Sequence, residues 1–223
     1  MKKVILIAFL AIGQFMAAQV TKNLGDFTTV RAFDQINVTL VKSTANKIEI
    51  RGEKAGDVEV VTKGNDLKIR MKLSKLLQGD DIEATVYYTG NIDKIEASEG
   101  AFVGSADTFK ATAFEVNAKE GSTIKLNLEV SKLKSSAGSG STLELIGTAT
   151  NHDVVLKSGG ILKGKSLETA QTAVTINAGG EADVYATDFV EAKTRAGGDI
   201  NVYGNPKQVN ESKTAGGSIH IIK

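Results

Sequence analysis

The 223-residue sequence contains no cysteine, no tryptophan, one proline and two histidines. The absence of cysteine excludes disulfides, thiol catalysis, Fe–S clusters and Cys-ligated zinc, and it also excludes lipid attachment through a cysteine. His152 and His220 are too few for a multi-histidine metal site and leave little room for a histidine-based triad. We therefore expect no metal, no cofactor and no catalytic residues.

Aromatic residues make up only 5% of the chain, and the charges nearly cancel, with 27 Lys+Arg against 26 Asp+Glu. This balance gives no electrostatic reason to expect a nucleic-acid partner. The hydrophobic fraction of 41% is enough for a packed core and too high for a disordered chain. Because aromatics are scarce, that core must consist of Val, Ile, Leu and Ala.

Residues 1–18 have the layout of a secretory signal peptide. Basic Met1–Lys3 precedes an apolar run over Val4–Phe15, and small residues follow at Met16–Ala18. The run is short for a transmembrane span, and no later segment is apolar enough to cross a bilayer. We expect an exported chain without a membrane span, located in the periplasm, on the outer surface or in the medium. An uncleaved N-terminal anchor is the less favoured alternative.

Residues 19–92 predict antiparallel strands. Between Phe33 and Tyr88, apolar and polar residues alternate with a period of two, which is typical of strands with one buried face. The turn sequences at 43–46 and 63–66 are short enough for hairpins, which would join neighbouring strands antiparallel.

An internal repeat of about twenty residues fills residues 93–223. Small residues recur at spacings of 18 to 21, and a glycine follows each of them within two or three residues. The small residues are Ala97, Ala118, Ala137, Ser158, Ala178, Ala196 and Ala215, and the glycines are Gly100, Gly121, Gly140, Gly160, Gly180, Gly198 and Gly217. Periods near twenty are typical of a solenoid.

Each repeat predicts a strand, a sharp corner and a second strand, with alternate residues pointing inward. Glycine supplies corner dihedrals that other residues avoid, and small residues let backbones stack closely. Because parallel crossovers are right-handed in most proteins, we predict an all-β fold. It is a right-handed parallel β-solenoid of about seven coils, continuous with the N-terminal strands in one domain, 19–223. In this register, larger side chains at Ala178 or Ala196 would overpack the corner.

Four motifs carry a resemblance to a known family: Phe33–Ile36, Lys47–Ile50, Gly64–Ile69 and Ile92–Ser98. They resemble the putative auto-transporter adhesin head GIN domain, a domain of unknown function in exported Bacteroidetes proteins. The similarity covers Phe33 to Ile222. It implies a right-handed β-helical fold and a cell-envelope location, and it brings no catalytic residues.

Outward positions on successive coils predict a contact surface. Exposed tyrosine combines a rigid apolar face with a hydroxyl, which suits sugar rings and protein partners. The alternative is a cross-strand ladder that only stabilises the sheet. The predicted binding residues are Lys163, Lys165, Asp183, Tyr185, Asn201 and Tyr203.

The favoured function is that of a non-catalytic, adhesin-like envelope protein that contacts glycans or surface proteins. Uniform coils without a long loop suit extended contacts better than a desolvated active site. One alternative is a polysaccharide lyase or hydrolase that uses Glu181, Asp183 and Asp199 near Arg195. Another is a periplasmic scaffold or sensor partner.

Two further expectations concern the end of the rod and the histidines. The last strand, Ile219–Ile222, would leave unpaired backbone groups, so we expect weak end-to-end self-association. His152 lies between Asn151 and Asp153, and we expect it to be exposed in a polar connection between coils. We expect His220 to point outward from the last strand.

Overall fold

The computed structural model describes residues 19–222, so the predicted signal peptide at 1–18 lies outside the described residues. The N-terminal strands are β1 (Gln19–Asn23), β2 (Thr29–Ala32), β3 (Asn37–Lys42), β4 (Lys47–Arg51), β5 (Val58–Lys63), β6 (Asp66–Met71) and β7 (Glu83–Tyr88). Two 3-10 helices, η1 (Ala55–Asp57) and η2 (Leu73–Lys75), lie among them. Neither of these helices has the length or apolar character that crossing a membrane requires, and this holds for the whole described range.

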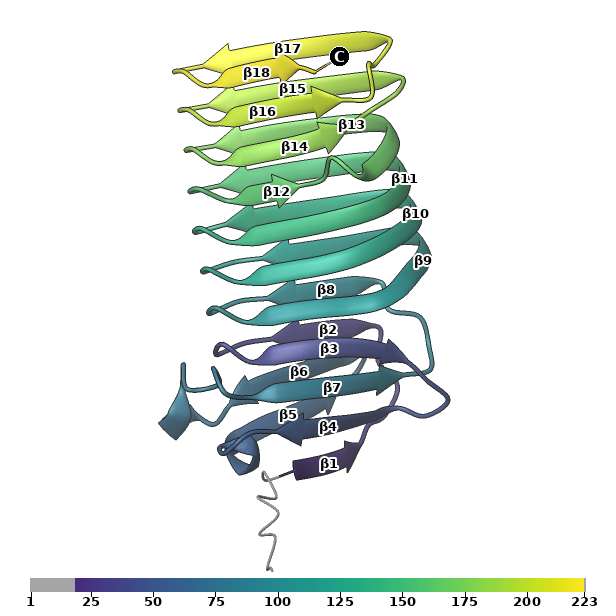
Figure 1. Ribbon diagram of the computed structural model, residues 1–223, viewed down its shortest axis with the longest axis vertical. Coiled ribbons are helices and arrows are strands. Elements are labelled where there is room, and N and C mark those ends of the chain that lie inside the picture. The colour runs from purple at the N-terminus through teal and green to yellow at the C-terminus, as the bar shows by residue number, and fades with distance from the viewer. Residues whose placement is uncertain (1–18, 223) are drawn as a thin grey trace, which may run out of the picture.

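The remaining strands form the regular part of the molecule. They are β8 (Lys94–Ala97), β9 (Phe102–Ala118), β10 (Thr123–Gly138), β11 (Thr142–Lys157), β12 (Ile161–Lys163), β13 (Leu167–Asn177), β14 (Glu181–Tyr185), β15 (Phe189–Arg195), β16 (Asp199–Tyr203), β17 (Gln208–Thr214) and β18 (Ser218–Ile221). Each coil pairs in parallel with the coils next to it, from β8–β9 to β16–β18. The coils wind in the right-handed sense (Figure 1), so the predicted parallel β-solenoid is confirmed.

Seven nearly identical tight turns stack along one side of the solenoid, which we call the turn side (Figure 1). In each turn two consecutive residues have positive φ, the pattern of a type I′ turn. The pairs are Glu99-Gly100, Glu120-Gly121, Ser139-Gly140, Ser158-Gly159, Ala178-Gly179, Ala196-Gly197 and Ala215-Gly216. Backbone N–H groups of one turn donate to carbonyls of the next, for example Gly121 N to Ser139 O at 3.0 Å.

The predicted register along the repeat is wrong by two residues in part of the chain. The sequence alignment set Ala137 beside Ser158, whereas the structure pairs Ala137 with Leu156. Ala178 and Ala196 are therefore exposed residues of the turns, and the predicted overpacking at these two positions is also wrong. A shift of two residues keeps the inward and outward alternation of a strand, so the hydrophobic pattern does not reveal it.

The first residue after each turn packs against the strand that precedes the turn of the coil before it, and it is small throughout. Where the strand holds alanine, serine can follow the turn, and Ser122 Oγ donates to the Ala97 carbonyl at 2.8 Å. Where the strand holds a large residue, only glycine fits, because a Cβ on Gly198 would lie 2.6 Å from the Ile176 side chain. The contacting pairs are Ala97 with Ser122, Ala118 with Ser141, Ala137 with Gly160, Ile176 with Gly198 and Thr194 with Gly217.

The N-terminal section is only partly antiparallel. β2 and β3 form a coil of the solenoid, parallel to β8 and β9, and β6 and β7 lie in parallel on their other side. Antiparallel pairing is found for β1–β4, β4–β7 and β5–β6. The hairpin predicted at 63–66 is confirmed. The hairpin predicted at 43–46 is wrong, because both edges of β3 are occupied and β4 pairs with β7 instead.

The core is built mainly from aliphatic side chains, as expected, but it also contains His152. This residue is 2% exposed, and its Nε2 lies 2.8 Å from Ser135 Oγ. β11 passes through this position without a break, and its alternation places His152 inside, in register with Leu133 and Thr172. The predicted exposed connection is therefore wrong. Burial lowers the pKa of His152 to about 3, so the imidazole is neutral at neutral pH.

Candidate functional site

The side of the solenoid opposite the turns, which we call the open side, differs from coil to coil. Two coils are longer than their neighbours, the one between the turns at Glu99 and Glu120 and the one between the turns at Ser158 and Ala178. The extra residues of the first coil form a bulge at 105–107 of β9, and those of the second fall in the loop 164–166 between β12 and β13. Both departures line cavities.

Three of the predicted binding residues lie together on the open side. Tyr185 and Tyr203 occupy the same register position on β14 and β16, and Lys165 Nζ lies 4.7 Å from the centroid of the Tyr203 ring. With Gly204, Asn205 and Ile222 they line a cavity of about 450 Å³, here called the tyrosine cavity. Burial and the nearby carboxylates of Asp183 and Glu181 raise the pKa of Tyr203, so its hydroxyl stays protonated at neutral pH.

The other three predicted binding residues are bonded within a column of outward side chains. Lys163 Nζ donates to Glu144 Oε1 at 2.8 Å, and Asn201 Nδ2 donates to Asp183 Oδ1 at 3.0 Å. The hydrogen bond between Lys163 and Glu144 lowers the pKa of the carboxyl and raises that of the ammonium. These bonds join neighbouring coils, so they support the interpretation as a stabilising ladder. His220 ends this column in register with Asn201 and is exposed, as expected.

A second cavity on the open side lies beside this column. It has a volume of about 400 Å³, and its lining includes Lys125, Ile146, Lys163 and Lys165. Ile146 is 48% exposed, which is high for an isoleucine. Lys163 and Lys125 both pair with Glu144, at 2.8 and 3.6 Å, and Lys165 lies over the Tyr203 ring.

The carboxylates considered for catalysis do not form an enclosed site. Glu181 and Asp199 occupy one register position on β14 and β16, and both are exposed. Asp183 is bonded to Asn201, and Arg195 is exposed at the beginning of a turn. Glycoside hydrolysis needs two carboxyl groups that flank the scissile bond in a substrate-binding site, and these exposed strand positions do not enclose one. Among residues 19–222, no group of three or more His, Cys, Asp or Glu is placed to hold a metal ion.

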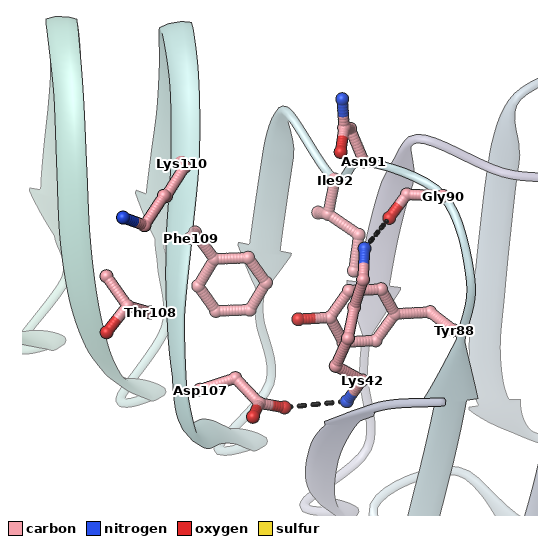
Figure 2. Close-up of a pocket in the computed structure, with 9 residues that line it drawn as sticks. All are labelled: Lys42, Tyr88, Gly90, Asn91, Ile92, Asp107, Thr108, Phe109 and Lys110. Carbon is pink, nitrogen blue, oxygen red and sulfur yellow. Dashed lines mark hydrogen bonds between the residues drawn. The ribbon is translucent and has the colours of Figure 1, made fainter. Parts of the chain in front are cut away.

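Sequence reasoning missed a third cavity, which lies where the N-terminal section meets the regular coils. We call it the seam cavity; its volume is about 320 Å³, and its lining includes Lys42, Tyr88, Ile92, Asp107 and Phe109 (Figure 2). The Tyr88 and Phe109 rings stack at 5.8 Å between centroids with an angle of 14° between their planes. Lys42 Nζ donates to the Gly90 carbonyl at 2.6 Å and lies 5.0 Å from the Tyr88 ring centroid. The sequence carried one signal for this cavity. The repeat residues that flank the coil containing Asp107 are spaced widely, which marks that coil as longer than its neighbours.

Comparison with known proteins agrees with this architecture. Residues 26–206 match the family model described as "Putative auto-transporter adhesin, head GIN domain". No curated protein matches the chain.

Several solved structures are similar. A putative adhesin from Bacteroides fragilis has a TM-score of 0.85 at 19% identity, with 92% of this chain and 96% of that chain covered. A putative adhesin from Parabacteroides distasonis gives 0.75 at 18%, covering 94% and 98%. A putative lipid binding protein from the same species gives 0.70 at 15%, also covering 94% and 98%. At these identities the likeness establishes the fold, which different functions can share.

Proposed function

Because the chain belongs to the family of putative auto-transporter adhesin head GIN domains, we propose that it is an adhesin-like contact protein of the cell envelope. Its partners are glycans or surface proteins. The observation that carries this proposal is the tyrosine cavity, where Lys165, Tyr185 and Tyr203 converge on the open side. Two tyrosine rings and an ammonium group offer stacking, hydrogen-bond donation and charge in one place.

The parallel ladder makes this surface suitable for binding without further ordering. β14 and β16 pair over all five residues, so the two tyrosines are held about 4.8 Å apart by backbone hydrogen bonds. A surface that is already ordered loses less conformational entropy on association. The exposed positions of Glu181 and Asp199 make the polysaccharide lyase or hydrolase the less favoured function.

Export is part of the proposal. The layout of residues 1–18 supports it, as does the cell-envelope character implied by the adhesin family. Fractionation of expressing cells, combined with surface labelling of intact cells, tests it. We expect the chain, cleaved near Gln19, outside the cytoplasm; an uncleaved cytoplasmic chain would contradict export.

The binding role is tested with the double variant Tyr185→Ala, Tyr203→Ala. Purified protein is screened for retention on immobilised host and bacterial glycans and envelope proteins, and its melting is measured in parallel. We expect lost retention with nearly unchanged melting. The matched control is Glu191→Ala, Lys193→Ala, which removes an ion pair of 2.7 Å from β15 in the same coils and should retain binding. A tyrosine variant that melts lower yet binds every partner normally would show that the pair is only a stabilising ladder.

A further inference from the structure

The seam cavity is produced by a local departure from the repeat. Lys125 of β10 pairs with Gly104 of β9, but Asn127, two residues later, pairs with Thr108. The three residues 105–107 thus oppose one residue, Leu126. β10 and β11 pass the equivalent position in unbroken register. Bulges of this kind are enriched beside functional sites, where they re-aim a side chain.

In this coil the re-aimed side chain is Asp107, and its position is fixed by several bonds. Ser105 Oγ donates to the Leu40 carbonyl at 2.8 Å and accepts from the Asp107 backbone N–H at 3.1 Å. Asp107 Oδ2 accepts from the Lys42 backbone N–H at 2.6 Å. A carboxylate offers about four acceptor positions, so Asp107 keeps capacity for a ligand.

Tyr88 supplies a buried donor on the same cavity. The residue is 4% exposed and lines the cavity, and among residues 19–222 its hydroxyl makes no hydrogen bond to the protein, although it is not one of the fully buried atoms left without a partner. Figure 2 shows this hydroxyl directed toward the side on which Asp107 and Phe109 lie. Burial, reinforced by the Asp107 carboxylate, raises the pKa of Tyr88 to about 12, so the group keeps its proton. The hydroxyl is therefore free to donate to a ligand or a water molecule in the cavity.

The remaining lining is apolar or balanced in charge. Phe109 and Ile92 are buried walls. The lining carries one ammonium at Lys42, bonded to the Gly90 carbonyl, and one carboxylate at Asp107, while Lys110 Nζ lies 2.6 Å from Glu129 Oε2. The cavity therefore favours a neutral ligand that has apolar C–H groups together with neighbouring hydroxyls. Its volume, near the lower end for small-molecule sites, fits one ring better than a chain of rings.

We propose that the seam cavity binds a single neutral sugar residue. The Tyr88 hydroxyl donates to one sugar hydroxyl, Asp107 accepts from a neighbouring one, and the C–H groups of the ring lie against Phe109 and Ile92. The proposal deepens the proposed function, on which it rests for its choice of ligand class, but it uses residues remote from the tyrosine cavity.

The test titrates residues 19–223 with neutral methyl glycosides of glucose, galactose, mannose, fucose and N-acetylglucosamine, and with methyl glucuronide as an anionic probe. Binding is measured by saturation-transfer NMR. We expect at least one neutral glycoside to bind, and Tyr88→Phe to weaken it about tenfold, the loss of one useful hydrogen bond. The same variant should melt close to the wild-type temperature, because the hydroxyl makes no hydrogen bond to the protein that the change would remove. Tyr87→Phe, on the opposite face of β7, is the matched control and should bind normally.

The proposal is overturned if no neutral glycoside binds, if Tyr88→Phe binds as well as wild type, or if methyl glucuronide binds more tightly than the neutral probes. The two proposals fail separately. Glycoside binding that survives Tyr185→Ala, Tyr203→Ala while partner retention is lost supports both sites. If the protein is retained on immobilised partners but binds no glycoside, the proposal of a sugar site in the seam cavity is refuted and the proposed function stands.

Discussion

The turn side and the open side of the solenoid are built by the same strands and obey different rules. On the turn side the seven turns from Glu99 to Gly216 repeat one backbone conformation, with two residues of positive φ and a small or absent side chain after them. On the open side β9, β10 and β11 curve round continuously, whereas later coils break into separate strands (Figure 1). The comparison teaches that repeated geometry holds the stack together, whereas the seam cavity and the two open-side cavities described above include residues where a coil departs from the repeat.

The largest expected effect comes from a change to the turn side. Gly198→Val adds a side chain whose Cβ would lie 2.6 Å from Ile176, at a residue with φ of +108°. Strain and overpacking together should cost about 2–5 kcal/mol, measured by denaturant unfolding. Ala196→Asn is the control within the same turn; it is exposed, and asparagine tolerates positive φ, so stability should change by less than about 1 kcal/mol. Equal effects of the two changes would refute the close packing of Gly198 against Ile176.

The next effect concerns a polar residue buried between the two sides. His152 has a folded pKa of about 3 against an ordinary value of 6.5, so between these values the unfolded chain binds a proton that the folded chain does not. Stability contributed by the neutral histidine is therefore complete above pH 6.5 and is lost as pH falls toward 3. The slope of this loss is about 1.4 kcal/mol per pH unit. His152→Leu should remove this slope from unfolding curves measured between pH 7 and 4. An unchanged pH dependence would show that the imidazole of His152 is exposed to solvent in the folded chain.

The smallest effect concerns the end of the stack. Within residues 19–222, β17 pairs only with β15 and β18 pairs only with β16, and β17 is exposed along nearly its whole length. The opposite end carries antiparallel strands instead. We predict weak end-to-end self-association through the β17–β18 edge, visible by sedimentation at high concentration and reduced by Ile221→Lys. A strict monomer at high concentration, unaffected by this change, would contradict it.

The sequence predicts the turn side better than the open side. Glycines that recur once in every coil reveal the stacked turns, because only a few residue types tolerate positive φ there. The same reasoning places Tyr185 beside Tyr203, as the structure does. The exact register is less accessible, because alanine serves as an inward residue at Ala137 and as an exposed turn residue at Ala178. For that reason the alignment slips by two residues without violating the hydrophobic pattern.

The seam cavity depends on contacts that no local pattern encodes. β7 follows β6 in the chain but stacks against β3, which brings Tyr88 near Asp107. The two residues are brought together by the stacking order of coils, not by spacing along the sequence. The burial of His152 is hard to predict from the sequence for a different reason. Its polar neighbours Asn151 and Asp153 resemble a loop, although the strand continues through them.

The central claim, that departures from the repeat serve binding and the repeat itself serves folding, is tested most directly by excising Ala106 and Asp107. The deletion gives this coil the same length as the coil that follows it, and it would set Ser105 opposite Leu126, continuing the register of β9 and β10. The measurement is glycoside titration of the excised variant beside its circular dichroism and thermal melting. The account predicts a folded solenoid that melts close to wild type and no longer binds the neutral glycosides. An excised variant that unfolds, or that still binds them, would contradict it.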